Sequence, residues 1–294
     1  MKSSRMPGAE IRWREYRKAV TNYIAEEIQT GETVAIIGAG ACDDIEIGTL
    51  LAQGAEIWLA DIDTEAMKSV MLRMSDQNHV WAERLHWIET DLMQLFDSER
   101  RDYEDACIGC AALETWWNRR DQQWEQGLNI YKDIYKVMRE QAIRQFDHVI
   151  CLGVNSQLCI PLVLPLEREM KMDDREWYQQ AVQRIRQENE RLARAFLAET
   201  GKIARQMVLG LEYTTIYRTQ AYREQQICQA LEENGSIGLH ALKLPRVEGA
   251  YQVEQELGIQ CRRGDVQIKD HQYMLWPFSE EKTYLMVIFK LLTI

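Results

Sequence analysis

The chain has 294 residues, of which 46% are hydrophobic, enough apolar material for one large α/β domain or two small ones. This composition excludes intrinsic disorder over most of the chain. No run approaches the roughly 18 consecutive apolar residues of a membrane span, and the first residues lack the apolar stretch of a secretory signal. Seven scattered cysteines, an odd number, suit a reducing compartment better than a disulfide framework. We therefore expect a soluble, cytoplasmic protein with no membrane partner.

The charge balance is acidic, with 35 Lys and Arg against 46 Asp and Glu and a net charge of −11. Such a surface repels polyphosphate on average. Arginines recur between residues 184 and 205, but Glu188, Glu190 and Glu199 are interleaved with them, which is typical of a solvated helix face. The composition predicts a small-molecule substrate and no nucleic-acid partner, and it leaves the oligomeric state open.

The chain reads as a single domain over residues 1–294, because it has only five prolines and no Ser/Gly/Pro-rich linker. Residues 1–32 form an N-terminal helical extension in this interpretation. Within it, apolar residues of 9–30 recur at spacings of mostly three and four, which predicts an amphipathic helix ending before Gly31.

Short apolar runs alternate with helical segments through the middle of the chain, which is typical of a parallel sheet with crossover helices. The predicted strands are 33–37, 56–60, 85–88, 147–152 and 203–211. Helices are expected over 44–53 and 64–74. The tail, 273–277 followed by 283–291, resembles an antiparallel hairpin that closes the sheet.

Two segments, 97–145 and 165–200, are longer than ordinary connections in α/β units. Both have helical composition and carry aromatic residues, among them Trp116 and Trp117. These insertions could form a cover over a substrate, in which case the two tryptophans contact it. A helical stripe that packs on the core explains the aromatic residues equally well.

Three strand ends carry the groups that point to chemistry. Gly38-Ala39-Gly40 follows the first strand, where glycine lets the backbone approach a ligand. Asp61 ends the second strand, 61 − 38 = 23 positions after the first glycine, where a carboxylate can accept hydrogen bonds from a ribose diol. Asp91 follows the third strand. Because parallel strands end at one edge of a sheet, we expect all three groups to share one crevice.

The motifs VAIIGAGACDD, IWLADID, WIETDLMQL, FDHVICLGVNSQL and TYLMVIFKL, in this order, resemble those of class I S-adenosylmethionine-dependent methyltransferases. The resemblance covers about residues 32–100, 146–160 and 200–294. It implies an α/β fold with a mostly parallel, seven-stranded Rossmann-like sheet, an antiparallel C-terminal hairpin and helical insertions. It also implies S-adenosylmethionine as the cofactor and methyl transfer as the activity, here to a small-molecule acceptor.

The resemblance assigns roles along the cofactor. Gly38, Ala39 and Gly40 would lie under its methionine part, and Asp61 would grip the ribose. Ile62 would pack on the adenine, Asp91 would hold the adenine amino group, and Leu92 would lie beside it. Gly153 to Asn155 would face the sulfonium and the acceptor, so Gly153 is expected at the cofactor and Asn155 at the substrate.

The sequence departs from the family pattern at two places. Ile36 stands where the family commonly has an acidic residue, and Cys42 takes the third glycine position, followed by Asp43 and Asp44. A grip on the methionine ammonium is then either missing or supplied by Asp43 or Asp44. No catalytic base is identified among the five histidines, and no metal site is expected, because the CxxC pair at 107 and 110 has no second pair.

Other functions use the same strand-turn-helix. The chain could transfer another group from the same cofactor, or bind the cofactor without turnover. An NAD-dependent oxidoreductase is disfavoured, because Asp43 stands where its fingerprint has Gly or Ala. A carboxylate there also opposes a pyrophosphate at the helix start.

Overall fold

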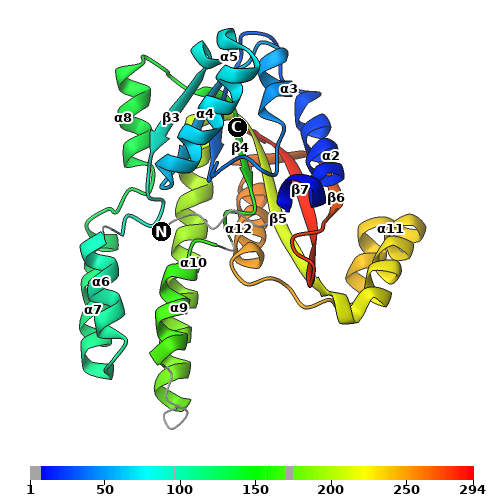
Figure 1. The fold of residues 1–294 in the computed structure, drawn as a ribbon. Coiled ribbons are helices and arrows are strands. Elements are labelled where there is room, and N and C mark those ends of the chain that lie inside the picture. The colour runs from blue at the N-terminus through cyan, green and yellow to red at the C-terminus, as the bar shows by residue number, and fades with distance from the viewer. Residues whose placement is uncertain (1–7, 96, 156, 170–174) are drawn as a thin grey trace.

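A computed structural model describes residues 8–95, 97–155, 157–169 and 175–294, and Figure 1 shows a twisted central sheet with helices on both sides. The sheet has seven strands in the order β3-β2-β1-β4-β5-β7-β6. Their bounds are β1 (Thr33–Ile37), β2 (Glu56–Asp61), β3 (Leu85–Glu89), β4 (Phe146–Leu152), β5 (Ala204–Tyr217), β6 (Val266–Trp276) and β7 (Lys282–Thr293).

The strand order creates the crevice in which a ligand can bind. Strands β1 to β5 pair in parallel, whereas β7 runs antiparallel between β5 and β6. The chain moves outward from β1 to β3 and returns to β4 on the other side of β1, so the topological switch lies between β1 and β4. The predicted α/β fold with a mostly parallel Rossmann-like sheet and a C-terminal hairpin is confirmed.

Helices cover both faces of the sheet, which explains why its inner strands read as continuous apolar runs. One face carries α1 (Ala9–Arg12), α2 (Arg14–Ala25), α3 (Ile47–Ala52), α4 (Thr64–Gln77) and α5 (His79–Glu83). The other face carries α8 (Lys132–Glu140), α10 (Arg175–Ile203) and α12 (Ala250–Arg263). None of the helices in the described segments is long and apolar enough to cross a membrane.

The insertions are helical, as the sequence predicts. Helices α6 (Asp97–Ala106) and α7 (Cys110–Glu125) precede α8 between β3 and β4, and α9 (Ile160–Glu169) precedes α10 between β4 and β5. In Figure 1, α6 and α7 hang below the sheet beside α9 and α10, and α11 (Ala221–Ala241) projects on the other side.

A buried ion pair joins α7 to α10. Arg120 Nε donates to Glu188 Oε1 at 2.7 Å, and both side chains are 1% exposed. Arg120 Nη2 also donates to the backbone oxygen of Met93, and Trp124 Nε1 donates to Glu188 Oε2 at 2.8 Å. These hydrogen bonds satisfy both charges, so the pair connects the insertion to the loop that follows β3.

Replacing Arg120 by Met should lower the free energy of unfolding by about 3–5 kcal/mol, because the Glu188 charge is then buried without its partner. Arg119→Met is the matched control. Arg119 pairs with Asp102 at 3.4 Å on the surface, and such pairs contribute about 0–1 kcal/mol. Urea unfolding of both variants measures the difference, and equal losses would contradict the prediction.

Candidate functional site

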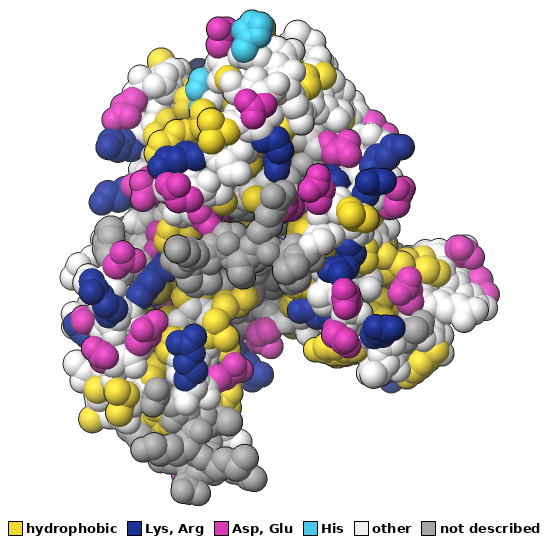
Figure 2. Space-filling model, in the orientation of Figure 1, with side chains coloured by type: hydrophobic (Ala, Val, Ile, Leu, Met, Phe, Trp, Pro, Cys, Tyr) yellow, Lys and Arg dark blue, Asp and Glu magenta, His cyan; other side chains and the backbone are white. Residues whose placement is uncertain are grey.

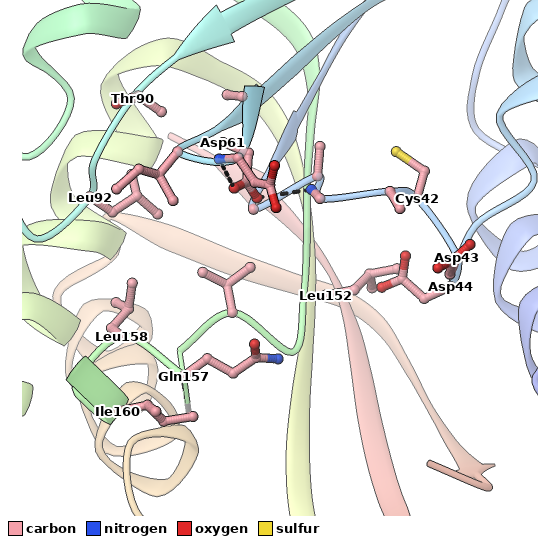
Figure 3. Close-up of a pocket in the computed structure, with 18 of the residues that line it drawn as sticks. Cys42, Asp43, Asp44, Asp61, Thr90, Leu92, Leu152, Gln157, Leu158 and Ile160 are labelled. Atoms are coloured by element: carbon pink, nitrogen blue, oxygen red, sulfur yellow. Dashed lines mark hydrogen bonds between the residues drawn. The ribbon is translucent and has the colours of Figure 1, made fainter. Parts of the chain in front are cut away.

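A cleft of about 490 Å³ opens at the carboxyl ends of β1, β2 and β4 (Figure 3). Its walls come from the turn after β1, the ends of β2, β3 and β4, the start of α9, and aromatic residues near both ends of the chain. Among the described residues the side chains or backbone that line it are Trp13, Gly38, Ala39, Gly40, Ala41, Cys42, Asp43, Asp44, Ala60, Asp61, Ile62, Asp63, Thr90, Asp91, Leu92, Met93, Arg100, Leu152, Val154, Gln157, Leu158, Ile160, Pro161, Trp276 and Phe278.

The glycine turn after β1 brings backbone to the cleft surface. Gly38 has a φ of +70°, and a Cβ added there would lie 2.1 Å from Val154 Cγ2. Only glycine therefore allows this turn to pack against the end of β4. Gly40 has a φ of +48°, and a Cβ there would meet no described atom within 4 Å. The space over Gly40 is open to a ligand.

Asp61 connects the end of β2 to this turn. The Gly40 N–H donates to Asp61 Oδ2 at 2.8 Å, and the Asp63 N–H donates to Oδ1 at 2.8 Å (Figure 3). Burial raises the pKa of Asp61, while these backbone hydrogen bonds act in the opposite direction. An ionised carboxylate has about four acceptor positions, so Asp61 can accept two further hydrogen bonds from a ligand.

Asp91 organises the loop after β3. Its Oδ1 accepts from the Met93 N–H at 3.0 Å, and its Oδ2 accepts from the Leu95 N–H at 3.0 Å and from Arg100 Nη2 at 2.9 Å. The neighbouring Thr90 Oγ1 is buried with no hydrogen-bond partner among the described residues. Because Thr90 lines the cleft, it offers a hydroxyl to a ligand at this end.

Asp43 and Asp44 lie at the far end of the turn from Asp61, after the buried Cys42 (Figure 3). Burial raises the pKa of Asp44 to about 7, Asp43 adds to the rise, and a backbone hydrogen bond and Arg17 oppose it. Asp44 can therefore exchange a proton near neutral pH.

The structure brings most of the predicted cofactor residues together. Those that line the cleft are Gly38, Ala39, Gly40, Asp61, Ile62, Asp91 and Leu92. Gly153 lies between the lining residues Leu152 and Val154, in a left-handed conformation with a φ of +62°. The backbone positions these groups as expected for strands that end at one sheet edge.

The predicted substrate residues lie further inside the protein. Asn155 is 2% exposed, and its amide oxygen and nitrogen have no hydrogen-bond partner in the described ranges. Trp116 and Trp117 are buried in α7 and pack on Tyr103, with ring centroids 4.7 and 6.1 Å away. Neither tryptophan lines the cleft as described. From the 97–145 insertion, Arg100 does.

Three aromatic residues of the cleft, Trp13, Trp276 and Phe278, were not predicted as site residues. They come from the α1–α2 junction and from the end of β6 and the turn after it. The signal available in the sequence was a cluster of aromatic residues in two segments expected to lie next to the sheet. Periodicity could not show that the two segments meet at the cleft.

No known family profile matches the sequence, and no curated protein matches it either. Solved structures do. The glycopeptide N-methyltransferase MtfA in complex with S-adenosyl-L-methionine is 10% identical, with 94% of this chain and 86% of that chain covered and a TM-score of 0.43. A candidate RNA methyltransferase from Pyrococcus horikoshii is 10% identical (96% and 83% covered, TM-score 0.38). A candidate rRNA methylase from Clostridium thermocellum is 9% identical (95% and 97% covered, TM-score 0.40).

Identities of about 10% with TM-scores below 0.5 do not establish activity or acceptor. The resemblance to class I methyltransferases is confirmed at the level of the fold, because the strand order is that of a Rossmann-like sheet with one antiparallel strand.

The expectation that excluded nucleic acid as a partner is wrong, since RNA methyltransferases are among the matched structures. The physical reason is that a net charge of −11 is an average over the whole surface and does not describe any one groove. Figure 2 shows basic and acidic side chains interspersed on the face in view.

No group of three or more His, Cys, Asp or Glu side chains in the described segments is arranged to hold a metal ion. The chemistry that the cleft can perform with its own groups is therefore recognition by carboxylates and ring faces, with Asp44 as a proton acceptor.

Asp44→Asn should stabilise the protein increasingly as the pH rises from about 4 to about 7. In this window folded Asp44, whose pKa is near 7, retains a proton that an unfolded Asp has released. The wild type therefore loses stability with rising pH, on the order of a few kcal/mol in total. Urea unfolding at pH 4, 6 and 8 measures the difference between variant and wild type. A difference that stays constant over this range would contradict the raised pKa.

Proposed function

We propose that the protein binds S-adenosylmethionine in this cleft and transfers its methyl group to an acceptor. The observation that carries the proposal is the Asp61 carboxylate at the end of β2, hydrogen-bonded to the Gly40 N–H beside the open space over Gly40. A ribose diol fits against the remaining acceptor positions of that carboxylate.

The residues present fit the rest of the cofactor. Gly38 to Gly40 offer backbone to its methionine part, and Asp43 and Asp44 supply the negative charge that Ile36, buried in β1, does not. Near the adenine, Ile62 and Leu92 offer apolar surface, and Asp91 offers a carboxylate. The orphaned Thr90 hydroxyl gains a partner when this end of the cleft is filled.

The cofactor, when bound, supplies an activated methyl group, so the protein has to bind, orient and exclude water. Leu152, Val154 and Leu158 give the cleft an apolar side opposite the glycine turn (Figure 3). An NAD-dependent reaction fits less well, because Asp43 and Asp44 line the cleft where a pyrophosphate would approach.

A binding and labelling experiment tests the proposal. S-adenosylmethionine and S-adenosylhomocysteine should raise the melting temperature of the protein, whereas NAD should not. Incubation of the protein with methyl-labelled cofactor and fractionated cell extract should then move label into an acceptor. The fraction that carries the label, whether small molecules, RNA or protein, identifies the acceptor class. Stabilisation by NAD alone would overturn the proposal.

Gly40→Ala should lower the affinity for S-adenosylhomocysteine at least tenfold, because the new methyl group projects into space that the ligand would occupy. Gly31→Ala is the matched control. Gly31 also has a positive φ, +86°, and no described atom within 4 Å of an added Cβ, but it precedes β1 at the other end of the strand. Both variants should lose about 1–2 kcal/mol of stability.

Calorimetric titration of the two variants separates the effects. Retained affinity in Gly31→Ala with reduced affinity in Gly40→Ala is the expected result. An equal loss of affinity in both would show that the effect is one of stability and not of ligand contact.

A further inference from the structure

Trp13, Trp276 and Phe278 form one side of the cleft, called here the aromatic wall. The rings of Trp13 and Trp276 are 5.0 Å apart and meet edge to face, those of Trp276 and Phe278 are 5.1 Å apart in the same manner, and those of Trp13 and Phe278 stack at 5.8 Å. All three residues line the cleft. The wall therefore presents several ring faces and edges to one small volume.

The charge around this volume is strongly negative. The carboxylates that line the cleft are Asp43, Asp44, Asp61, Asp63 and Asp91. Among the lining residues that the structure describes, Arg100 is the one cation, and it pairs with Asp91 at 2.9 Å at the adenine end. The end near Asp44 has acidic groups without a neighbouring lining cation.

Polar groups continue behind the aromatic wall. Tyr16 stacks on Trp276 at 5.4 Å, and both side chains are buried. The Tyr16 hydroxyl and Trp276 Nε1 have no hydrogen-bond partner in the part of the chain that is described. Burial raises the pKa of Tyr16, and the charges of Asp44 and Glu212 add to the rise. Asp44 and Glu212 therefore both act at the back of the wall.

Glu212 connects the wall to the turn after β4. It is 1% exposed, and a Cβ added to Gly153 would lie 3.1 Å from Glu212 Oε1 and 3.3 Å from Trp276 Cζ3. A carboxyl group and an indole thus pack directly on the segment that follows β4. Negative charge is held next to the rings on the side where that turn meets the cleft.

Ring faces and carboxylates together recognise organic cations. Building on the proposed function, we infer that the aromatic wall with Asp44 is the acceptor subsite, and that the acceptor enters it as a protonated amine. A polyphosphate would face the cleft carboxylates unfavourably at this position, whereas an ammonium group gains from both the ring quadrupoles and the charges.

The reaction balances with the groups present. Asp44 takes one proton from the ammonium group, which frees the nitrogen lone pair. The nitrogen forms a bond to the methyl carbon as the carbon–sulfur bond breaks, and the electron pair of that bond stays on sulfur. The products are a methylated ammonium ion, neutral S-adenosylhomocysteine and protonated Asp44.

The test compares two probes of nearly the same shape, 2-phenylethylamine, which is protonated at neutral pH, and 2-phenylethanol, which carries no charge. Each is titrated calorimetrically into protein saturated with S-adenosylhomocysteine. We expect at least a tenfold preference for the amine in the wild type. Phe278→Leu and Asp44→Asn should each reduce that preference at least fivefold. Tyr222→Leu, at an exposed site on α11, should keep it.

Each outcome decides the inference. Equal affinity for the two probes in the wild type, or an amine preference that persists in Phe278→Leu and Asp44→Asn, would overturn the amine subsite. Label that passes to RNA in a reaction that the amine does not inhibit would overturn it as well. If S-adenosylhomocysteine does not bind, the proposed function fails. The same titration on the protein alone then shows whether the aromatic wall binds the amine independently.

Discussion

The hydrogen bond from the Gly40 N–H to the Asp61 carboxylate is the interaction on which the cleft depends. It ties the turn after β1 to the end of β2 at 2.8 Å and holds the carboxylate on the cleft side of the sheet. Gly38 packs so closely on Val154 that a Cβ would overlap it, which brings in the end of β4. Three strand ends are thus held together by contacts that use backbone or the absence of a side chain, and the space above them stays open.

The opposite side of the cleft has another origin. Trp13 Nε1 donates to the backbone oxygen of Phe278 at 3.0 Å, and Arg12 pairs with Glu280 at 3.3 Å. The first helices therefore dock on the C-terminal hairpin, and the aromatic wall results from that docking. Cofactor recognition rests on the parallel half of the sheet, whereas the groups available to an acceptor come from segments that are far apart in the sequence.

The sequence predicted the parallel strands well because each is buried on both faces and reads as an apolar run. It predicted β6 only from residue 273 onward, although the strand begins at Val266. Residues 267 to 272 are exposed on the edge of the sheet and polar, so no hydrophobic period marks them. The helix predicted over 9–30 is interrupted at Trp13, which has a φ of −89° and a ψ of 3°. That break places the indole at the cleft, and a period of 3.6 residues cannot reveal it.

The position of β7 between β5 and β6 has a consequence for the order of assembly. Strand β6 hydrogen-bonds only to β7, so it cannot join the sheet until the residues that follow it in the chain have paired with β5. Such non-local pairings form late, because the loop entropy must be overcome before the contacts stabilise the sheet. During synthesis the glycine turn and Asp61 emerge first, and Trp276 and Phe278 among the last. A growing chain can therefore form the cofactor half of the cleft well before the half that selects what is methylated.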